Sequence, residues 1–336
     1  MSICSTDDSG VAAPVGESRW RWAIFLALAL LGASSAGAQD YPNKPVRIVV
    51  GFAAGSASDL VARALGQKLG ASLGQPFIVE VRPGAGSNVA AQYVVRSPKD
   101  GYTLFVATSS STIRGAGAAN LGFDFSTDLE PIAAIASVPF VLTAYPGLGV
   151  KTVPDFIALA KAKPDALTFG GTAVGTSGYL AAQLFNQQAG TSLAIAPYPS
   201  TAQATTDLMT GRISIAFASA ANVLQLIEEG KLTALAVSQP RRAAIIPQVP
   251  TIDEAGLPGV YASLWIGMLA PAGTPRAIVE TLSKAVNDAL KADDVANQLR
   301  LQGMELMGGS PDDFAQRIKR DTARWDAVLQ SANIRQ

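Results

Sequence analysis

The stretch VRIVVGFAAGSASDLVARAL (Val46–Leu65) decides the fold class, because it passes from strand to helix through one short loop. Val46–Phe52 is an unbroken apolar run rich in β-branched residues, which predicts a buried strand. From Ser58 to Gly74, apolar residues recur at a spacing near 3.6 and a glycine closes the segment, which predicts a helix. Strand, short loop and helix in this order form the unit from which parallel α/β sheets are built.

The same alternation continues along the chain in two series. We predict strands at residues 46–52, 76–81, 102–108, 166–171, 193–198, 213–219 and 232–238, and a further strand from 264 onward. We predict helices at residues 58–74, 86–97, 153–164, 177–190, 202–211, 222–230, 276–292 and 311–332. This order indicates an α/β protein of two units, with mostly parallel sheets, flanking helices and a ligand cleft outside the carboxyl ends of the strands.

The first residues have the pattern of a secretion signal. Arg19 and Arg21 precede an apolar core at Ala23–Gly32, and the small residues Ala36–Ala38 fit a cleavage site. The apolar core is too short for a comfortable membrane span, so a retained membrane anchor is the weaker alternative. We predict that residues 1–38 are removed before Gln39 and that the mature chain resides in the periplasm.

Composition and missing residue types exclude several classes of function. Hydrophobic residues make up 49% of the chain and charged residues 15%, as in ordinary globular proteins. The 26 basic and 26 acidic residues balance, so no net field attracts nucleic acid or an anionic membrane. The sequence has no histidine, and Cys4 is its only cysteine. Serine–histidine and cysteine–histidine nucleophiles and zinc sites of nitrogen and sulfur ligands are therefore excluded, and we expect no metal.

Two glycine-rich stretches approximate known motifs but fail in detail. Pro83–Ala90 (PGAGSNVA) follows a predicted strand like a dinucleotide-binding fingerprint, but Val89 stands where the third glycine belongs. Gly175–Tyr179 (GTSGY) is similar to a nucleophile elbow, but it ends in tyrosine and no histidine exists to complete a triad. We therefore expect no nucleotide or other cofactor.

The loop GFAAGSASD has the properties of an anion cradle. Unpaired backbone N–H groups and the positive end of the helix dipole meet where a strand passes into a helix, and small residues let an anion approach. A second copy, Phe169–Leu180 (FGGTAVGTSGYL), also joins a predicted strand to a predicted helix. Two such loops could grip one anion from both sides. The alternative is that both are tight connections with helix caps at Ser58 and Ser177.

With these features the chain resembles the receptor family of tripartite tricarboxylate transporters over nearly everything after residue 40. The resemblance rests on the landmarks Tyr41–Val50 (YPNKPVRIVV), Val81–Ala91 (VRPGAGSNVAA), Asp100–Leu104 (DGYTL), Gly175–Ala181 (GTSGYLA), Val249–Gly259 (VPTIDEAGLPG) and Met268–Pro275 (MLAPAGTP). It implies a two-domain periplasmic-binding-protein fold, a Venus flytrap that closes on its ligand. It also implies a monomer that passes a small carboxylate to the membrane components of the transporter.

The resemblance further implies the domain limits and the binding loops. Domain 1 would comprise residues 41–140 and 264–315, and domain 2 residues 141–263 and 316–336. The loops matching Phe52–Asp59 and Thr172–Ser177 would bind a ligand carboxylate through backbone N–H groups.

Departures from the family pattern narrow the ligand class. Pro197–Thr201 (PYPST) lacks the lysine that family members often carry, and Ala218 followed by Ser219 replaces an aspartate that suits an amino acid ammonium group. Short apolar and hydroxyl side chains remain, which favours a dicarboxylate with an apolar middle. Terephthalate is the example we expect, and plain C4 or C6 carboxylates are the alternative. The expected ligand-binding residues are Phe52, Ala53, Ala54, Gly55, Ser56, Ala57, Ser58, Asp59, Ser109, Thr172, Thr176, Ser177, Ser200, Thr201, Ala218 and Ser219.

A second class of function stays open at this point. A secreted α/β enzyme acting on a small anionic substrate could use carboxylates such as Asp59 or Asp207 as acid and base. The simpler interpretation of Asp59 is an acidic residue in the first turn of a helix, where the helix dipole favours it.

Overall fold

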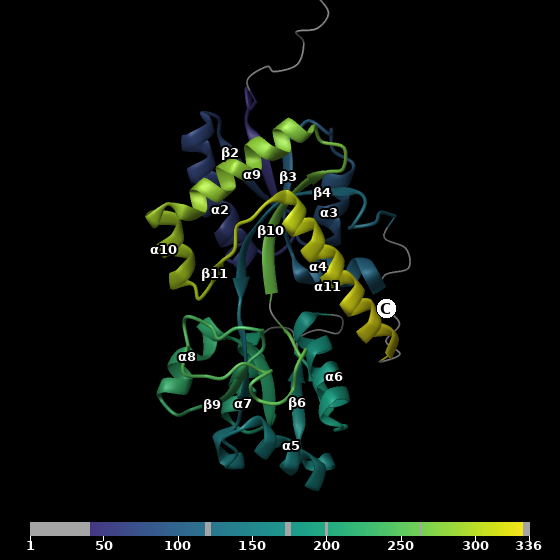
Figure 1. Ribbon diagram of the computed structural model, residues 1–336, viewed down its shortest axis with the longest axis vertical. Coiled ribbons are helices and arrows are strands. Elements are labelled where there is room, and N and C mark those ends of the chain that lie inside the picture. Colours follow the sequence, from purple (N-terminus) through teal and green to yellow (C-terminus); the bar gives the residue numbers. More distant parts are fainter. Residues whose placement is uncertain (1–40, 118–121, 172–175, 199–200, 263, 332–336) are drawn as a thin grey trace, which may run out of the picture. The chain divides into compact units, whose positions relative to one another are not determined.

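The structure, a computed structural model, describes residues 41–117, 122–171, 176–198, 201–262 and 264–331 (Figure 1). Residues Lys44–Gln336 group into one compact unit, to which the following description refers. The signal segment predicted at residues 1–38 lies outside the described residues.

The first of two sheets has six strands in the order β11-β4-β10-β3-β1-β2. Its strands are β1 (Val46–Val50), β2 (Phe77–Val81), β3 (Thr103–Thr108), β4 (Leu129–Val138), β10 (Leu264–Pro271) and β11 (Glu305–Leu306). β1 pairs in parallel with β2 and β3, whereas β10 runs antiparallel to β3 and β4. The carboxyl ends of β1, β2 and β3 therefore meet at one edge of this sheet.

The second sheet has five strands in the order β7-β6-β8-β5-β9. Its strands are β5 (Phe140–Ala144), β6 (Thr168–Gly171), β7 (Ala194–Pro197), β8 (Ile215–Ser219) and β9 (Thr233–Val237). β6 pairs in parallel with β7 and β8, and β5 runs antiparallel to β8 and β9. Both sheets thus combine a parallel part with antiparallel strands.

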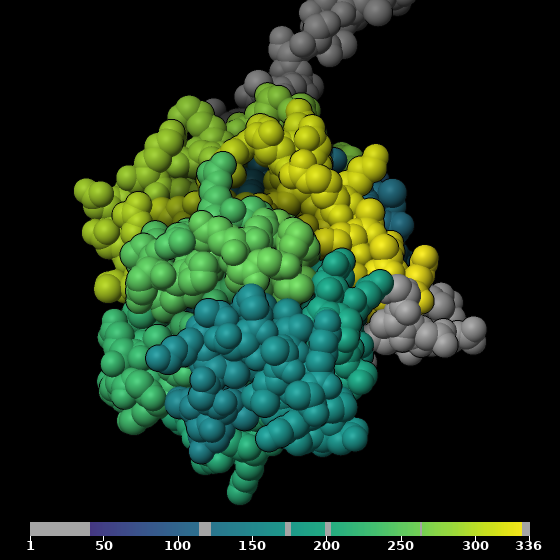
Figure 2. Space-filling view, turned by 60° about the horizontal axis from the view of Figure 1, so that its bottom comes forward, coloured from purple at the N-terminus to yellow at the C-terminus, as the bar shows by residue number. Residues whose placement is uncertain are grey.

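Helices flank both sheets. They are α2 (Ala57–Leu73), α3 (Asn88–Val95), α4 (Ser109–Gly117), α5 (Val153–Ala162), α6 (Ser177–Ala189), α7 (Thr201–Met209), α8 (Ala220–Glu228), α9 (Arg276–Lys291), α10 (Asp293–Leu301) and α11 (Pro311–Ser331), with short 3₁₀ turns η2 (Ala85–Ser87), η3 (Pro146–Leu148) and η4 (Pro164–Ala166). The surface of α5 comes forward in Figure 2, in blue-teal, while its Val153 and Phe156 are buried beneath.

The predicted α/β class with flanking helices is confirmed, with one difference. The sheets are mixed and not mostly parallel, because the strands that cross between them, β4, β5 and β10, run against their neighbours. β4, β5, β11, α4 and α10 were not among the predicted elements. The limits of the two domains stay a prediction.

The first crossing is a single residue, Pro139, between β4 in the first sheet and β5 in the second. The carbonyl of Pro139 accepts the N–H of Ala220 at 2.9 Å, and that of Phe140 accepts the N–H of Ser238 at 2.7 Å. From its first carbonyl onward, the crossing segment is therefore hydrogen-bonded to the start of α8 and to the residue that follows β9.

The core of the six-stranded sheet has an apolar layer on each face. Val49 of β1 packs with residues of α3 and α11 in a cluster that contains Phe105, Trp265 and Phe314. The adjacent Ile48 points to the other face, where its Cδ1 lies against Gly66 of α2. This alternation along β1 is the period of two expected of a strand buried on both faces.

The last helix is fixed to the sheet by an aromatic contact and a hydrogen bond. The rings of Trp265 and Phe314 meet edge to face with centroids 5.2 Å apart. Trp265 Nε1 donates to Asp321 Oδ2 at 2.7 Å. Gly267 of β10 makes room for this packing, because a Cβ there would lie 2.1 Å from Phe314 Cζ.

We expect Gly267→Ala to lower the free energy of unfolding by about 1–3 kcal/mol, as overpacked cores do, because the added methyl group has to displace the Phe314 ring. Gly70→Ala in α2 is the matched control, since a Cβ there has no contact closer than the 3.4 Å to Gln75 O. Alanine favours a helix interior over glycine, so this variant should be neutral or more stable. Urea denaturation of both variants measures the difference, and equal stabilities would contradict the packing argument.

Candidate functional site

The loop between β1 and α2 is held in shape by its own side chains. Gly55 has φ +81°, a conformation that glycine adopts without strain. Asp59 Oδ2 accepts the Gly55 N–H at 2.9 Å, while the Ser56 hydroxyl accepts the Asp59 N–H at 3.4 Å. The carboxylate of the first helical turn thus reaches back and clamps the loop.

Asp59 is itself paired with Arg63 one turn along α2. Arg63 Nε donates to Oδ2 at 3.1 Å, and Arg63 Nη2 lies 3.1 Å from Oδ1. Burial alone would raise the pKa of Asp59, but the hydrogen bonds from Arg63 and Gly55 and the charge of Arg63 hold it below its ordinary value. The carboxylate is therefore ionised at neutral pH, and the guanidinium balances its charge beside the loop.

The start of α2 offers backbone donors to an anion. In the described residues no hydrogen bond involves the N–H groups of Ala57 and Ser58, the first two of the helix. Helix N-termini with such donors are anion sites. Ala53, Ala54 and Gly55 are exposed beside them.

The turn between β6 and α6 repeats this arrangement. The Thr176 hydroxyl accepts the Tyr179 N–H at 3.4 Å and caps the helix. The next two N–H groups, of Ser177 and Gly178, take part in no hydrogen bond among the described residues. Each of the two loops therefore presents a pair of first-turn donors.

The caps themselves are not where the simpler interpretation of the loops put them. That interpretation assigned capping to Ser58 and Ser177, but the caps are Ser56 and Thr176. The reason is that α2 begins at Ala57, one residue earlier than predicted, and α6 begins at Ser177 itself. Ser58 and Ser177 are both buried in the first turn and do not cap.

The remaining predicted residues have different surroundings. Phe52, Ser56 and Ala57 are half-buried in the first loop, and Ser109 starts α4 at the end of β3. Ala218 packs in the apolar core of the second sheet, whereas the neighbouring Ser219 precedes α8 without capping it. Thr172 and Ser200 lie outside the described residues, as does the side chain of Thr201.

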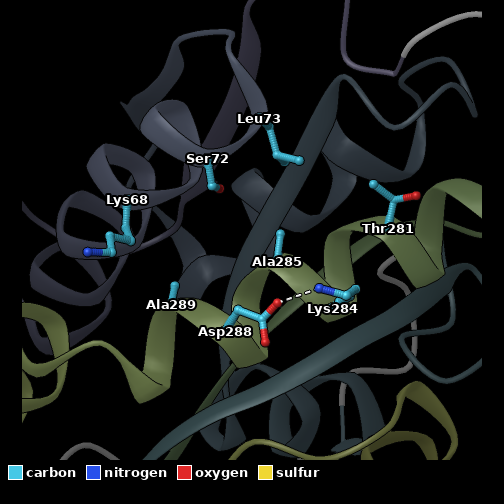
Figure 3. A pocket seen from close by; sticks show the side chains of 8 residues that line it. All are labelled: Lys68, Ser72, Leu73, Thr281, Lys284, Ala285, Asp288 and Ala289. Carbon is cyan, nitrogen blue, oxygen red and sulfur yellow. Dashed lines mark hydrogen bonds and ion pairs between the residues drawn. The ribbon is translucent and has the colours of Figure 1, made fainter.

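The surface also carries a groove away from these loops, between α2 and α9 (Figure 3). It has a volume of about 330 Å³, and Lys68, Ser72 and Leu73 face Thr281 and Ala285 across it. No residue of the predicted site lines it. In the same described part of the chain, no group of three metal-ligating side chains could hold a metal ion, and no helix is long and apolar enough to cross a membrane.

The two carboxylates considered for acid–base chemistry have structural partners. Asp59 is bound by Gly55 and Arg63, as described above. Asp207 Oδ2 accepts the Tyr198 hydroxyl at 2.8 Å, and its Oδ1 lies 3.2 Å from Arg212 Nη1. Burial and this bond to Asp207 raise the pKa of Tyr198. Both arrangements stabilise local structure and leave the carboxylates engaged.

A protein-family model matches most of the chain. The family model described as "Tripartite tricarboxylate transporter family receptor" matches residues 61–334. Protein BugT of Bordetella pertussis is 32% identical over 315 residues, which are 93% of this chain and 96% of that protein.

Solved structures of similar proteins include carboxylate complexes. R. palustris Rpa4515 with adipate is 34% identical, with a TM-score of 0.74 over 88% of this chain and 99% of that one. MatC from Rhodopseudomonas palustris with bound malate is 30% identical, with a TM-score of 0.72 over 86% of this chain and 100% of that one. A structure of the periplasmic binding protein BugD is 28% identical, with a TM-score of 0.72 over 88% of this chain and 99% of that one.

We expect Asp59→Asn to lower the free energy of unfolding by about 2 kcal/mol at pH 7, because a buried charge-assisted clamp is lost. The pKa of Asp59 is lower in the folded than in the unfolded chain, so its stabilisation is complete above the unfolded value of about 3.9 and disappears as the pH falls through the folded value. Urea unfolding at pH 7 and pH 3 should show the difference between wild type and variant shrinking in acid.

Asp288→Asn is the control for this prediction, since Asp288 pairs with Lys284 on an exposed helix surface where solvent screens the charges. It should change stability much less than Asp59→Asn. A difference for Asp59→Asn that stayed constant from pH 7 to pH 3 would count against the clamp.

Proposed function

The chain belongs to the receptor family of tripartite tricarboxylate transporters, and from this premise we propose that it is a periplasmic solute-binding protein for a small carboxylate. It would deliver this ligand to the membrane components of the transporter. A monomer suffices for this role, because each chain contains both anion loops.

The observation that carries the proposal is the pair of helix starts at α2 and α6, where the side-chain cap leaves the first two N–H groups of each helix without a partner. Ala57 and Ser58 in one loop and Ser177 and Gly178 in the other present backbone N–H groups without internal partners. The helix dipoles add positive potential at the same places. Helix α4, which follows β3 of the first sheet, contacts α6, the helix that follows the second loop. This contact joins the two halves of the chain in which the loops lie.

The character of the side chains supports a dicarboxylate with an apolar middle. Ala53 and Ala54 are exposed and leave room for a flat or extended hydrocarbon body. Asp59 is already neutralised by Arg63, and no further charged side chain belongs to the predicted site. The relatives solved with adipate and malate bind compounds with two carboxyl groups. We propose terephthalate as a representative ligand, with C4 and C6 dicarboxylates as the alternative.

The surroundings of Asp59 and Asp207 speak against the alternative function, a secreted enzyme, that the sequence left open. An acid–base catalyst needs a carboxyl group able to exchange a proton near neutral pH. Asp59 has a lowered pKa and is paired with Arg63, while Asp207 holds Tyr198 and Arg212. Chromatography of a bound ligand after prolonged incubation would reveal turnover if the enzyme interpretation were correct.

Isothermal titration calorimetry should compare terephthalate, benzoate, adipate, succinate, citrate and glutamate. We expect a dicarboxylate with an apolar middle to bind at micromolar concentration, which corresponds to about −8 kcal/mol. Citrate should bind more weakly, because its third charge meets no cation in the predicted site. Heat released by citrate or glutamate but not by terephthalate or adipate would overturn the proposed ligand class.

Variants of the predicted site refine this experiment. Ser177→Ala and Ser219→Ala should each weaken binding of the best ligand by about 1 kcal/mol, the net value of one hydrogen bond. A bulky residue in place of Ala54 should weaken it more by filling the space for the hydrocarbon body. Ser97→Ala is the control, because its hydroxyl donates to Tyr93 O within α3 and the residue is not part of the predicted site.

Affinity for a fully ionised dicarboxylate should be nearly constant from about pH 6 to 8. The chain has no histidine, and Asp59, the titratable residue of the predicted site, has a pKa below its ordinary value and stays ionised. Titrations at both ends of the range measure this. A tenfold change, about 1.4 kcal/mol, would reveal a titrating group in contact with the ligand.

A further inference from the structure

A group of buried polar atoms at the carboxyl edge of the six-stranded sheet has no hydrogen-bond partner in the described structure. They are the side-chain oxygens of Ser87, Asn88, Thr108, Ser109 and Ser111. The exposed fractions of these five side chains lie between 0% and 7%. Of the five, the expected ligand-binding residues include only Ser109.

The strand register brings these residues together. Val50 of β1 pairs with Val81 of β2 and with Val106 of β3, so all three strands end at one place. The η2 turn, which ends at Ser87, contacts α4. The Ser87 hydroxyl occupies the space above Gly51 at the end of β1, where a Cβ on Gly51 would lie 1.8 Å from Ser87 Oγ. The group is thus adjacent to the start of the β1–α2 loop.

The backbone around Ser87 is held in an unusual conformation. Ser87 has φ +86° and Ala85 has φ +44°, both in the left-handed region that disfavours side chains. Ser87 precedes α3 without a side-chain hydrogen bond to it. This is the PGAGSNVA stretch that failed as a dinucleotide fingerprint. The turn therefore leaves a helix N-terminus uncapped beside unpartnered hydroxyls.

A buried polar atom without a hydrogen-bond partner lowers the stability of the fold, so five such atoms in one place need an explanation. Among the described residues, Arg82 and Arg47 have other partners, because Arg82 pairs with Glu80 and lies over the Tyr93 ring, and Arg47 donates to the Tyr93 hydroxyl. Apart from the amide oxygen of Asn88, which can only accept, the group offers a set of neutral hydroxyl donors near the N-termini of α3 and α4. Such a set suits an anionic oxygen pair, since a carboxylate accepts about four hydrogen bonds.

We propose that the hydroxyl groups of Ser87, Ser109 and Ser111 form a subsite for the second carboxylate of the ligand. The proposal rests on the proposed function, in which the β1–α2 and β6–α6 loops hold the first carboxylate. The oxygens are covered by neighbouring groups, so the η2 turn has to shift when a ligand reaches them. Gly84 before this turn and Gly86 within it have φ +145° and +63°, and they provide the backbone freedom for that movement.

The test compares ligands that differ by one carboxylate. Calorimetry measures the dissociation constants of adipate and hexanoate, and of terephthalate and benzoate, for wild type, Ser87→Ala and Ser111→Ala. We expect wild type to prefer the dicarboxylate of each pair. Each variant should reduce that preference about fivefold, the value of roughly one hydrogen bond, while affinity for the monocarboxylate changes less than about twofold.

Ser72→Ala is the matched control, because the Ser72 hydroxyl donates to Leu69 O within α2 and lines the groove shown in Figure 3. It should leave the preference unchanged. Thermal unfolding supplies a second measurement. Ser87→Ala and Ser111→Ala remove unpartnered hydroxyls and should not lower Tm, whereas Ser238→Ala should, because its hydroxyl donates to Val260 O and accepts the Ala262 N–H.

The outcomes separate the two proposals. If no carboxylate binds to wild type, both the receptor function and the subsite are overturned. If a dicarboxylate binds but the variants keep its preference over the monocarboxylate, or lose both affinities equally, the subsite alone is overturned. A large loss of Tm in Ser87→Ala would show that this hydroxyl has a structural partner and would also contradict the subsite.

Discussion

The hydrogen bond from Gly55 N–H to the Asp59 carboxylate is the constraint on which the candidate site depends. It ties the middle of the β1–α2 loop to the first turn of α2, and Arg63 fixes the carboxylate in turn. With the side chain of Asp59 occupied in this way, the N–H groups of Ala57 and Ser58 are left as the donors of the loop. A receptor that grips an anion by backbone alone needs such a clamp, because small residues cannot hold a loop in shape by packing.

The sequence predicts the elements that follow strong local rules. The strand, loop and helix at Val46–Leu65 are observed nearly as expected, because β-branched residues, glycine and a helical repeat agree there. β4 was missed because its sequence LEPIAAIASV is rich in alanine and contains Pro131. The proline is tolerated since β11 pairs only with Ser137 and Ala136, so that part of β4 has a single neighbour. α4 begins with three serines and a threonine, which favour helices weakly, and contacts with β3 and β10 compensate.

The candidate site was predictable in outline and not in detail. The two loops follow from small residues between strand and helix, but the caps at Ser56 and Thr176 depend on where each helix begins. Arg63 could have been found, because an acid and a base four residues apart on a helix are a known pair. The unpartnered oxygens of Ser87 and Ser111 could not, since no sequence pattern shows whether a buried hydroxyl finds an acceptor.

The one-residue crossing at Pro139 has a consequence for the entropy of ligand capture. Proline has a fixed φ, and the carbonyls of Pro139 and Phe140 are bonded to Ala220 and Ser238, so few soft torsions remain between β4 and β5. Because each backbone residue that becomes ordered costs about 1–2 kcal/mol, a connection with so few freely rotating bonds has little conformational freedom left to lose. More of the interaction energy with a small ligand then remains as affinity.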